Sequence, residues 1–383
     1  MNRRGFLAAG CAGCASLSPV LALAQDAWTP PARFTRPDLG SDEGGLWAMM
    51  DREERKLRRS PFTLRDEQLS AYVQDIVCRL AGEHCPDIRV HLVRTPYFNA
   101  SMAPNGMMQV WTGLLLRVEN EAQLAAVLGH ELGHYLSRHS VEQLRDVKAR
   151  AGFAQFLGLF GVVGAIGQIG LVASLYAYGR DHERDADRIG AWLMHKAGYD
   201  VSEAPRLWEN LRLEQSARAG GPEHPNPLFA VHPPAEERQS ALAELAQQLP
   251  GGSTNETVWR QRVRSFQLEW LADEVKRGQH EESIVLLTRM AKRWPAEAAY
   301  LFARAEVLRL RASGTDLDAA IQDYSAAAAL GGEPPETHRG LGFVHRLRSN
   351  ASAARASFQR YLELAPMAAD APMIKSYMEE LRL

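Results

Sequence analysis

The chain has 383 residues, which at roughly 150 residues per domain suggests two or three domains. Hydrophobic residues make up 46% and charged residues 23%, a balance that excludes a disordered tail protein, a collagen and a small disulfide-stapled scaffold. The formal net charge of -2 provides no basic field to hold a nucleic acid, so we expect no nucleic-acid partner.

The first 24 residues have the pattern of an export signal. Arg3 and Arg4 form a short positive region, an apolar stretch follows, and Ala22-Leu23-Ala24 is a small-x-small cleavage site. We therefore expect an exported protein that is cleaved after Ala24. The paired arginines resemble a twin-arginine signal, so the export route is either the twin-arginine system or the general secretory pathway. A lipoprotein signal ending at Cys11 is the alternative, with only about five apolar residues before it.

The mature chain keeps two of the four cysteines, Cys78 and Cys85. An even pair of cysteines in an exported protein predicts one disulfide, which here would close a small loop. Two free, buried thiols are the alternative.

The first part of the mature chain is expected to hold an extended lead-in, two helices and two strands. Residues 26–42 are rich in proline and aperiodic, whereas 43–59 and 65–82 have helical patterns. Alternating apolar residues predict a strand at 88–93. A second strand is expected at 109–112, after a Pro-Asn-Gly turn.

Two long helices are expected in the centre of the chain. The first covers 120–149 and starts at Asn120, which can cap it, with a glutamine three positions later as in a capping box. The second covers 182–197, with Asp181 as its cap and Gly198 at its end.

Residues 153–179 carry no charge, and a stretch of this length can span a membrane. Glycine recurs at every third position from Gly158 to Gly170, and each glycine weakens a helix by up to ~1 kcal/mol. We therefore favour a hairpin that is buried or touches a membrane surface. A membrane span is the alternative, because close glycine faces also occur in membrane helices.

The last third of the sequence is repetitive. Its small, aromatic and proline residues stand at tetratricopeptide offsets, which predicts three degenerate repeats at 264–297, 298–334 and 335–368 and a capping helix to residue 383. Stacked helix pairs of this kind form a concave groove that binds a peptide or a partner protein. An unrelated helical bundle is the alternative. The offsets are carried most clearly by Gly342, Ala354, Phe358 and Pro366.

The strongest chemical signal is His130-Glu131-Leu132-Gly133-His134, inside the predicted 120–149 helix. Residues four apart share one helix face, so both imidazoles can hold one metal ion while Glu131 lies beside it as a base. A chance match in this composition has a probability of about 2%. Two incidental histidines on a surface helix are the alternative.

A catalytic zinc needs three protein ligands and one open position, so a third ligand must come from elsewhere. The metzincin pattern is excluded, because Ser140 stands where its third histidine would be. Glu183 and Asp187 share one stripe of the second helix with small and apolar residues, and burying unpaired carboxylates costs several kcal/mol. We therefore assign Glu183 as the third ligand and Asp187 as acceptor of a ligand histidine's outer N–H. A surface network of arginines and carboxylates is the alternative.

Together, the two histidines and the stretch Glu183-Arg-Asp-Ala-Asp187 resemble the CAAX-prenyl-protease superfamily of gluzincin metallopeptidases. The resemblance covers about residues 45–245. The export signal and the C-terminal repeats narrow it to the soluble periplasmic branch. Three further stretches agree with the family pattern: Phe98-Asn99-Ala100, Thr112-Gly113-Leu114-Leu115, and His232-Pro233-Pro234 followed by Arg238. Ser101, which follows Ala100, departs from the family pattern.

For the fold, the resemblance implies an α+β, mostly α, zincin-like domain with a small sheet. We expect a signal peptide at 1–24, the metalloprotease domain at 25–250, a linker at 251–263 and an α-solenoid of tetratricopeptide-like repeats at 264–383. For the activity, it implies a periplasmic endopeptidase with one Zn²⁺ per chain, Glu131 as general base, and unfolded or misassembled envelope proteins as substrates. It also implies outer-membrane barrel proteins or their assembly machinery as partners.

For the remaining site residues, the resemblance implies that Asn99 and Ala100 form an edge strand to which an extended peptide can pair. It also implies that His232 can reach the zinc as a fourth ligand and close the site. A loop histidine braced by the following prolines is the alternative. Arg238 either stabilises the oxyanion or braces Asp187. The histidines left over are interpreted as structural or solvated: His139, His182 and His224.

Two other functions stay open. One is a repeat-based chaperone or assembly scaffold for outer-membrane proteins, whose protease domain is held silent. The other is a membrane-embedded protease that uses 153–179 as a span. The intact histidine motif and Glu183 favour an active endopeptidase over a scaffold, since a scaffold does not need them.

Overall fold

The computed structural model describes residues 28–151, 179–217, 232 and 236–381. The chain divides into two compact units, residues 1–32 and 33–383, and the features below all belong to the second. Two of the sequence predictions lie outside the described residues: the signal peptide and nearly all of the uncharged stretch 153–179.

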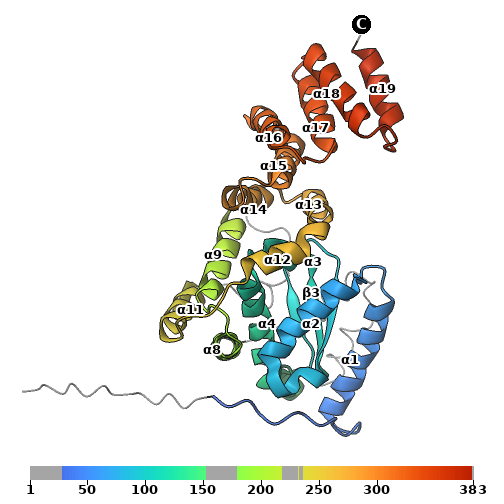
Figure 1. Cartoon of the computed structure of the whole chain (residues 1–383). Coiled ribbons are helices and arrows are strands. Elements are labelled where there is room, and N and C mark those ends of the chain that lie inside the picture. Colours follow the sequence, from blue (N-terminus) through green and yellow to red (C-terminus); the bar gives the residue numbers. More distant parts are fainter. Residues whose placement is uncertain (1–27, 152–178, 218–231, 233–235, 382–383) are drawn as a thin grey trace, which may run out of the picture. The chain divides into compact units, whose positions relative to one another are not determined.

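The architecture is α+β and mostly α, as the sequence predicted (Figure 1). Its single described sheet has three strands in the order β1-β3-β2, with β1 parallel and β2 antiparallel to β3. The strand β2 is therefore an edge strand. Helix α2 packs against β1 and α4. The elements of this part are α1 (Asp42–Arg59), α2 (Glu67–Ala81), the 3-10 helix η1 (Gly82–Asp87), β1 (Arg89–Val93), β2 (Ala100–Met102), β3 (Met107–Trp111) and α3 (Thr112–Arg117).

Tight backbone contacts set the geometry of this part. Gly106 lies in the turn between β2 and β3 at φ +87°, and a side chain there would start 2.0 Å from the carbonyl oxygen of Asp87. Only glycine fits such a turn.

Cys78 at the end of α2 and Cys85 in η1 are joined by a disulfide, with their Cα atoms 4.6 Å apart.

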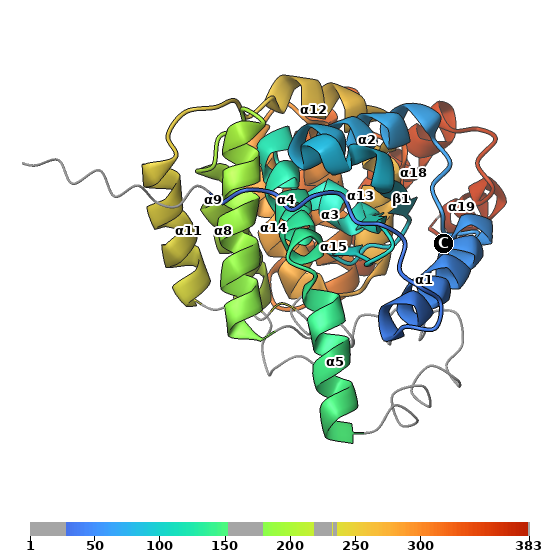
Figure 2. The ribbon, with the colours of Figure 1, turned by 90° about the horizontal axis from the view of Figure 1, so that it is seen from below.

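The two helices that carry the metal motif lie side by side (Figure 2): α4 (Glu121–Leu136) and α8 (Arg180–Lys196). Their contact is lined by glycine. A Cβ atom at Gly133 would lie 2.8 Å from the Cα atom of Ala186, and one at Gly190 would lie 2.9 Å from the backbone nitrogen of His130. The missing side chains therefore allow the two backbones to approach closely.

The ends of these helices differ in part from expectation. Asn120 caps α4 as predicted, accepting the Gln123 N–H at 2.9 Å. The helix expected at 120–149 is two helices, because Arg138 takes a left-handed conformation at φ 57° and α5 (His139–Ala151) starts after it. Asp181 is not the cap of α8. That helix begins at Arg180, two residues earlier than expected, with Gly179 at the cap position.

The segment expected as a linker is partly helical. After Gly251 and Gly252 the chain forms α12 (Glu256–Val263), and its Trp259 is buried and donates its indole N–H to the Val118 carbonyl at 3.2 Å. The segment therefore packs against the preceding region instead of running freely. The helices that lead to it are α9 (Glu203–Ser216) and α11 (Glu236–Gln248).

A buried ion triad joins the next helix to the same region. Arg117, at the end of α3, is 2% exposed and pairs with Glu214 of α9 at 2.8 Å and with both carboxylate oxygens of Glu274 at 2.9 and 3.0 Å. Glu274 belongs to α13 (Gln267–Lys276). Each glutamate also has a second arginine partner, Arg289 for Glu214 and Arg277 for Glu274, so the buried charges form one compensated network across these helices.

The C-terminal helices pack on their neighbours in chain order. Each of the three predicted repeats contains two helices, and Gly342 lies where a Cβ atom would meet the Phe358 ring at 2.3 Å, which explains the small residue at that offset. The tetratricopeptide assignment and the domain boundaries stay predictions. The elements are η2 (Arg264–Phe266), α14 (His280–Arg293), α15 (Ala298–Arg311), α16 (Asp316–Leu330), α17 (Glu336–Leu347), α18 (Ala351–Leu364) and α19 (Ala371–Glu380).

None of the described helices combines the length and the apolar character that crossing a membrane requires.

The glycine contact between α4 and α8 can be tested by adding one methyl group. We expect Gly133→Ala to lower the free energy of unfolding by about 1–3 kcal/mol, because the new Cβ atom collides with the backbone at Ala186. Denaturant unfolding monitored by circular dichroism measures this. The control is Gly45→Ala in α1, where nothing lies within 4 Å and the change should be neutral or stabilising by up to ~1 kcal/mol. Equal effects at both positions would contradict the close contact.

Candidate metal centre

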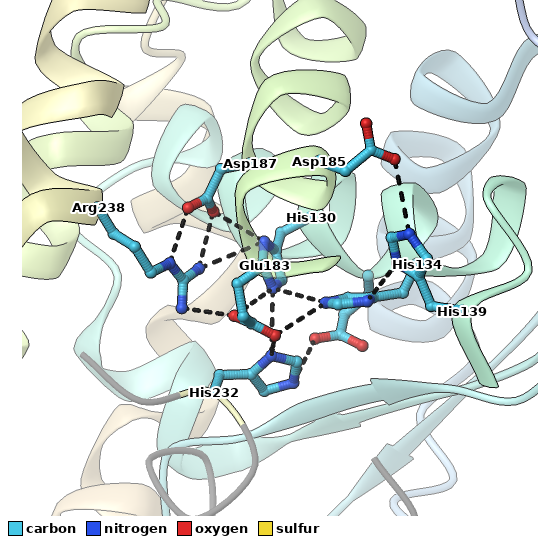
Figure 3. Close-up of polar contacts among 9 residues, drawn as sticks. His130, His134, His139, Glu183, Asp185, Asp187, His232 and Arg238 are labelled. Carbon is cyan, nitrogen blue, oxygen red and sulfur yellow. Dashed lines mark hydrogen bonds and ion pairs between the residues drawn. The ribbon is translucent and has the colours of Figure 1, made fainter. Parts of the chain in front are cut away.

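Four side chains from distant parts of the sequence converge in one buried cluster (Figure 3). His130 and His134 stand one turn apart on α4, Glu183 comes from the first turn of α8, and His232 comes from the segment before α11. Each offers one ligand atom, and these four atoms all lie within 4.8 Å of one another. The structure thus brings together the three predicted ligands and the predicted fourth one.

The distances within the cluster suit one small ion. The two Nε2 atoms of His130 and His134 are 3.1 Å apart, and Glu183 Oε1 lies 3.3 Å from His134 Nε2 and 2.8 Å from His232 Nδ1. A tetrahedral zinc ion with ligands at 2.0–2.1 Å separates its ligand atoms by about 3.3 Å. Three imidazole nitrogens and one carboxylate oxygen are also donors that zinc favours. The residues present therefore fit a zinc ion.

His130 is oriented by a carboxylate from α8. Its Nδ1 lies 2.9 Å from Asp187 Oδ1 and donates to it, which leaves Nε2 free to face the cluster. Asp187 therefore occupies the place predicted for it. Burial would raise the pKa of Asp187, but Arg238 and His130 outweigh burial and lower it.

Arg238 is the cation of the cluster. Its Nε and Nη2 each donate to Asp187 at 2.7 Å, and its Nη1 lies 2.6 Å from Glu183 Oε2. The guanidinium also stacks over the Trp208 ring at 4.7 Å. This placement favours the bracing role over the oxyanion role. Trp208 was missed at the sequence level, and no local pattern marks it.

The outer nitrogen of His134 faces another histidine. His134 Nδ1 lies 2.9 Å from His139 Nδ1, and His139 Nε2 lies 3.6 Å from Asp185 Oδ2 (Figure 3). The His139 ring also stacks on His182, with centroids 4.2 Å apart. His139 and Asp185 had no assigned role. Two features of the sequence could have pointed to them. His139 stands five residues after His134, and Asp185 lies midway between Glu183 and Asp187. His224 lies outside the described residues.

Glu131 lies beside the cluster rather than within it. Its carboxylate is buried, and Oε1 lies 3.5 Å from His232 Nε2. Burial raises the pKa of Glu131. Burial would also raise the pKa of Glu183, but His232 and the two helix histidines hold it well below its usual range. A group that can take up a proton therefore stands next to a carboxylate that stays charged.

The edge strand β2 runs past this cluster. The Asn99 carbonyl accepts the Trp111 N–H at 3.1 Å, and the Ala103 N–H donates to Met107 at 2.8 Å. In an antiparallel ladder the residues between such bonds turn their backbone groups the other way, so Ala100 directs its N–H and carbonyl toward the edge of the sheet away from β3. Met102, two residues further along β2, directs its backbone groups to the same edge. Asn99 and Ala100, the residues expected to form the peptide-pairing strand, both have buried side chains.

Comparisons with known proteins cover the region of this cluster. The family model described as peptidase family M48 matches residues 63–246. The putative beta-barrel assembly-enhancing protease of Vibrio cholerae is 26% identical over 236 residues, 56% of this chain and 48% of that protein. The beta-barrel assembly-enhancing protease of Escherichia coli is 25% identical over 237 residues, with the same shares. The mitochondrial metalloendopeptidase OMA1 of Arabidopsis thaliana is 32% identical over 173 residues, 45% of this chain and 34% of that protein.

This chain spans about half or less of the length of these relatives. The resemblance to a gluzincin metallopeptidase family, which the motifs indicated, is confirmed by these matches.

The bracing role of Arg238 can be tested by stability. We expect Arg238→Met to lower the free energy of unfolding of the metal-free protein by about 3 kcal/mol, because Asp187 and Glu183 lose their buried cation. Urea unfolding in the presence of a chelator measures this. The matched control is Arg184→Met on α8, a half-exposed ion pair with Glu237, which should change stability by less than about 1 kcal/mol. Similar losses in the two variants would argue against a buried brace.

Proposed function

Since residues 63–246 form a domain of peptidase family M48, we propose that this protein is a zinc-dependent endopeptidase of the cell envelope. Its proposed substrates are unfolded or misassembled envelope proteins, which enter the site as extended chains. The observation that carries the proposal is the buried group of His130, His134, Glu183 and His232 with Glu131 beside it.

The chemistry follows from where these side chains lie. When bound, zinc polarises a scissile carbonyl and makes water acidic enough to react near neutral pH. Glu131 lies next to the ligands without belonging to them, so it is the group that can accept a proton from water and return it to the leaving amine. Asp187 and Arg238 hold His130 in the tautomer that presents Nε2 to the metal.

Substrate selection is proposed to use the backbone of β2. The open edge at Ala100 supplies one N–H and one carbonyl, and an extended peptide can pair with them as an added strand. Such pairing would bring a peptide bond near α4, the helix that carries Glu131 and packs against β2. Backbone pairing favours unfolded chains of varied sequence, because it reads little of the side chains.

His232 is proposed to hold the enzyme in a latent state. Its Nδ1 lies 2.8 Å from Glu183 and 3.3 Å from His130, and its Nε2 lies 3.5 Å from Glu131. It thus stands at once in the fourth ligand position and against the proposed base. A water or a scissile carbonyl needs this same place, so His232 must leave before turnover.

The proposed setting of the activity is the periplasm. The export signal supports the periplasm, and two relatives are named for beta-barrel assembly, which supports outer-membrane barrel proteins or their assembly machinery as partners. A third relative is named as mitochondrial. The C-terminal helix pairs are proposed to dock clients or partners.

A second candidate function is a chaperone-like assembly scaffold with a latent protease domain. The position of His232 favours it, because a site closed by a fourth protein ligand is inactive until something displaces that ligand. The two functions differ in whether any condition produces cleavage.

The role of Glu131 predicts a separation of binding from turnover. We expect Glu131→Gln to bind about one zinc per chain like the wild type while its cleavage of casein falls by at least about 100-fold, because the proton acceptor is lost. Fluorescent casein and elemental analysis of the same preparations measure both. The control is Glu142→Gln on α5, which changes an exposed glutamate and should leave both values unchanged. Retained cleavage by Glu131→Gln would refute the assigned role.

The proposed blocking position of His232, called the latch here, predicts that removing this side chain raises the rate of cleavage. If the open state is populated at about a tenth or less, His232→Ala should cleave casein about tenfold faster than the wild type. A double variant with Glu131→Gln serves as the control and should be inactive. Equal rates for His232→Ala and the wild type would eliminate the latch, and zinc-loaded variants that never cleave would favour the scaffold.

A further inference from the structure

The two ligand histidines of α4 are supported in different ways. His130 donates its outer N–H to the carboxylate of Asp187, whereas the outer nitrogen of His134 lies 2.9 Å from an imidazole nitrogen of His139. A zinc-binding histidine nearly always donates its other N–H to an acceptor, and that acceptor fixes its tautomer and its ring orientation. His139 occupies this place for His134, and no function has been assigned to it above.

We propose that His139 is a positioning residue that holds metal ligand His134 in its Nδ1–H tautomer, with Asp185 holding His139 in turn. This inference rests on the proposed function, because it treats His134 as a zinc ligand. It adds a second chain of side-chain contacts behind the site, which runs from His134 on α4 through His139 on α5 to Asp185 on α8.

The positions of the protons follow from the geometry. His134 presents Nε2 to the cluster, so its proton must be on Nδ1 and must point at His139 Nδ1. That nitrogen of His139 must then carry a lone pair, because two N–H groups cannot face each other at 2.9 Å. The proton of a neutral His139 is therefore on Nε2, on the side of Asp185, whose Oδ2 lies 3.6 Å away as an electrostatic partner and not within hydrogen-bond distance.

The backbone is built to place His139. If α4 continued without a break, a residue five positions after His134 would point to a different side of the helix. Arg138 interrupts the helix with φ 57°, a conformation that costs a residue with a side chain roughly 1 kcal/mol. Its side chain pairs with Glu43 of α1 and lies over the Phe34 ring at 5.4 Å. These contacts hold the turn that brings the ring of His139 back beside His134.

Asp185 is held in place as well. Ser137 donates its hydroxyl to Asp185 Oδ2 at 2.7 Å, and Arg188 donates to Asp185 Oδ1 at 2.7 Å. Stacking on His182 fixes the plane of the His139 ring. Each member of the chain from His134 to Asp185 therefore has a second contact that fixes its direction.

An imidazole at this point also limits the buried charge. Glu131, Glu183 and Asp187 already place three carboxylates in the site, with Arg238 as the partner cation. A carboxylate in direct contact with His134 would bury one more negative charge, which is costly. The neutral ring of His139 accepts the hydrogen bond from His134 instead and leaves the charge on Asp185, whose side chain is 33% exposed.

Zinc affinity tests the positioning role without any assay of cleavage. His139→Phe keeps an aromatic ring beside His182 but offers no acceptor, so we expect zinc to bind about 10–100-fold more weakly. His139→Asn keeps an acceptor oxygen near the position of Nδ1 and should recover most of that loss. The control is His195→Phe on α8, an exposed histidine, which should bind zinc like the wild type. Competition with a chromophoric chelator gives the affinities of the full-length proteins, and their metal-free unfolding midpoints establish that they are folded.

The tautomers give a second readout, which a merely structural role would not fix. In zinc-loaded protein labelled with ¹⁵N-histidine, long-range nitrogen–proton spectra should show one neutral ring protonated on Nε2 that disappears in His139→Asn. A ring at position 139 protonated on Nδ1 would overturn the inference, and so would a His139→Phe variant that binds zinc as tightly as the wild type. Failure of the wild type itself to bind zinc would instead overturn the proposed function together with this inference.

Discussion

The close approach of α4 and α8 is the constraint on which the rest of the site depends. The two histidines of α4 and the carboxylate of Glu183 can share one ion only if the helix backbones nearly touch, and Gly133 and Gly190 make room for that approach. A larger residue at either position would move α8 outward and separate the donors. The same contact also sets the reach of Asp187 to His130, so the ligands and their support have one structural origin.

Burial turns this proximity into a strict charge balance. Carboxylates in a low-dielectric site must be paired, and Arg238 compensates Asp187 and Glu183 together. Asp185, which is partly exposed, requires no buried cation and acts through His139 instead. Helix α8 thus delivers acids at three alternate positions, and their different environments suit the proposed division of roles, in which one binds the ion and the other two orient its ligands.

Much of the site could be predicted because its signals are local. The histidines four residues apart, the cap at Asn120 and the apolar stripe that carries Glu183 and Asp187 all follow from helix periodicity. The break at Arg138 could not be predicted, since no glycine marks it and its partner Glu43 is 95 residues away in the sequence. The roles of His139, Asp185 and Trp208 depend on that break or on contacts between helices, which periodicity does not encode. The helical character of 256–263 was hidden for the same reason, because Trp259 packs against a distant carbonyl.

The buried triad of Arg117, Glu214 and Glu274 bears on how such proteins diversify. The matched relatives share only part of their length with this chain. Replacing everything after the expected linker would remove Glu274 together with Arg289, the second partner of Glu214, and would leave Arg117 and Glu214 to pair with each other alone. A new C-terminal module would then have to cover this pair or supply a carboxylate of its own to Arg117. The contact between Arg117 and Glu274 thus crosses the boundary that the glycine-rich sequence suggests.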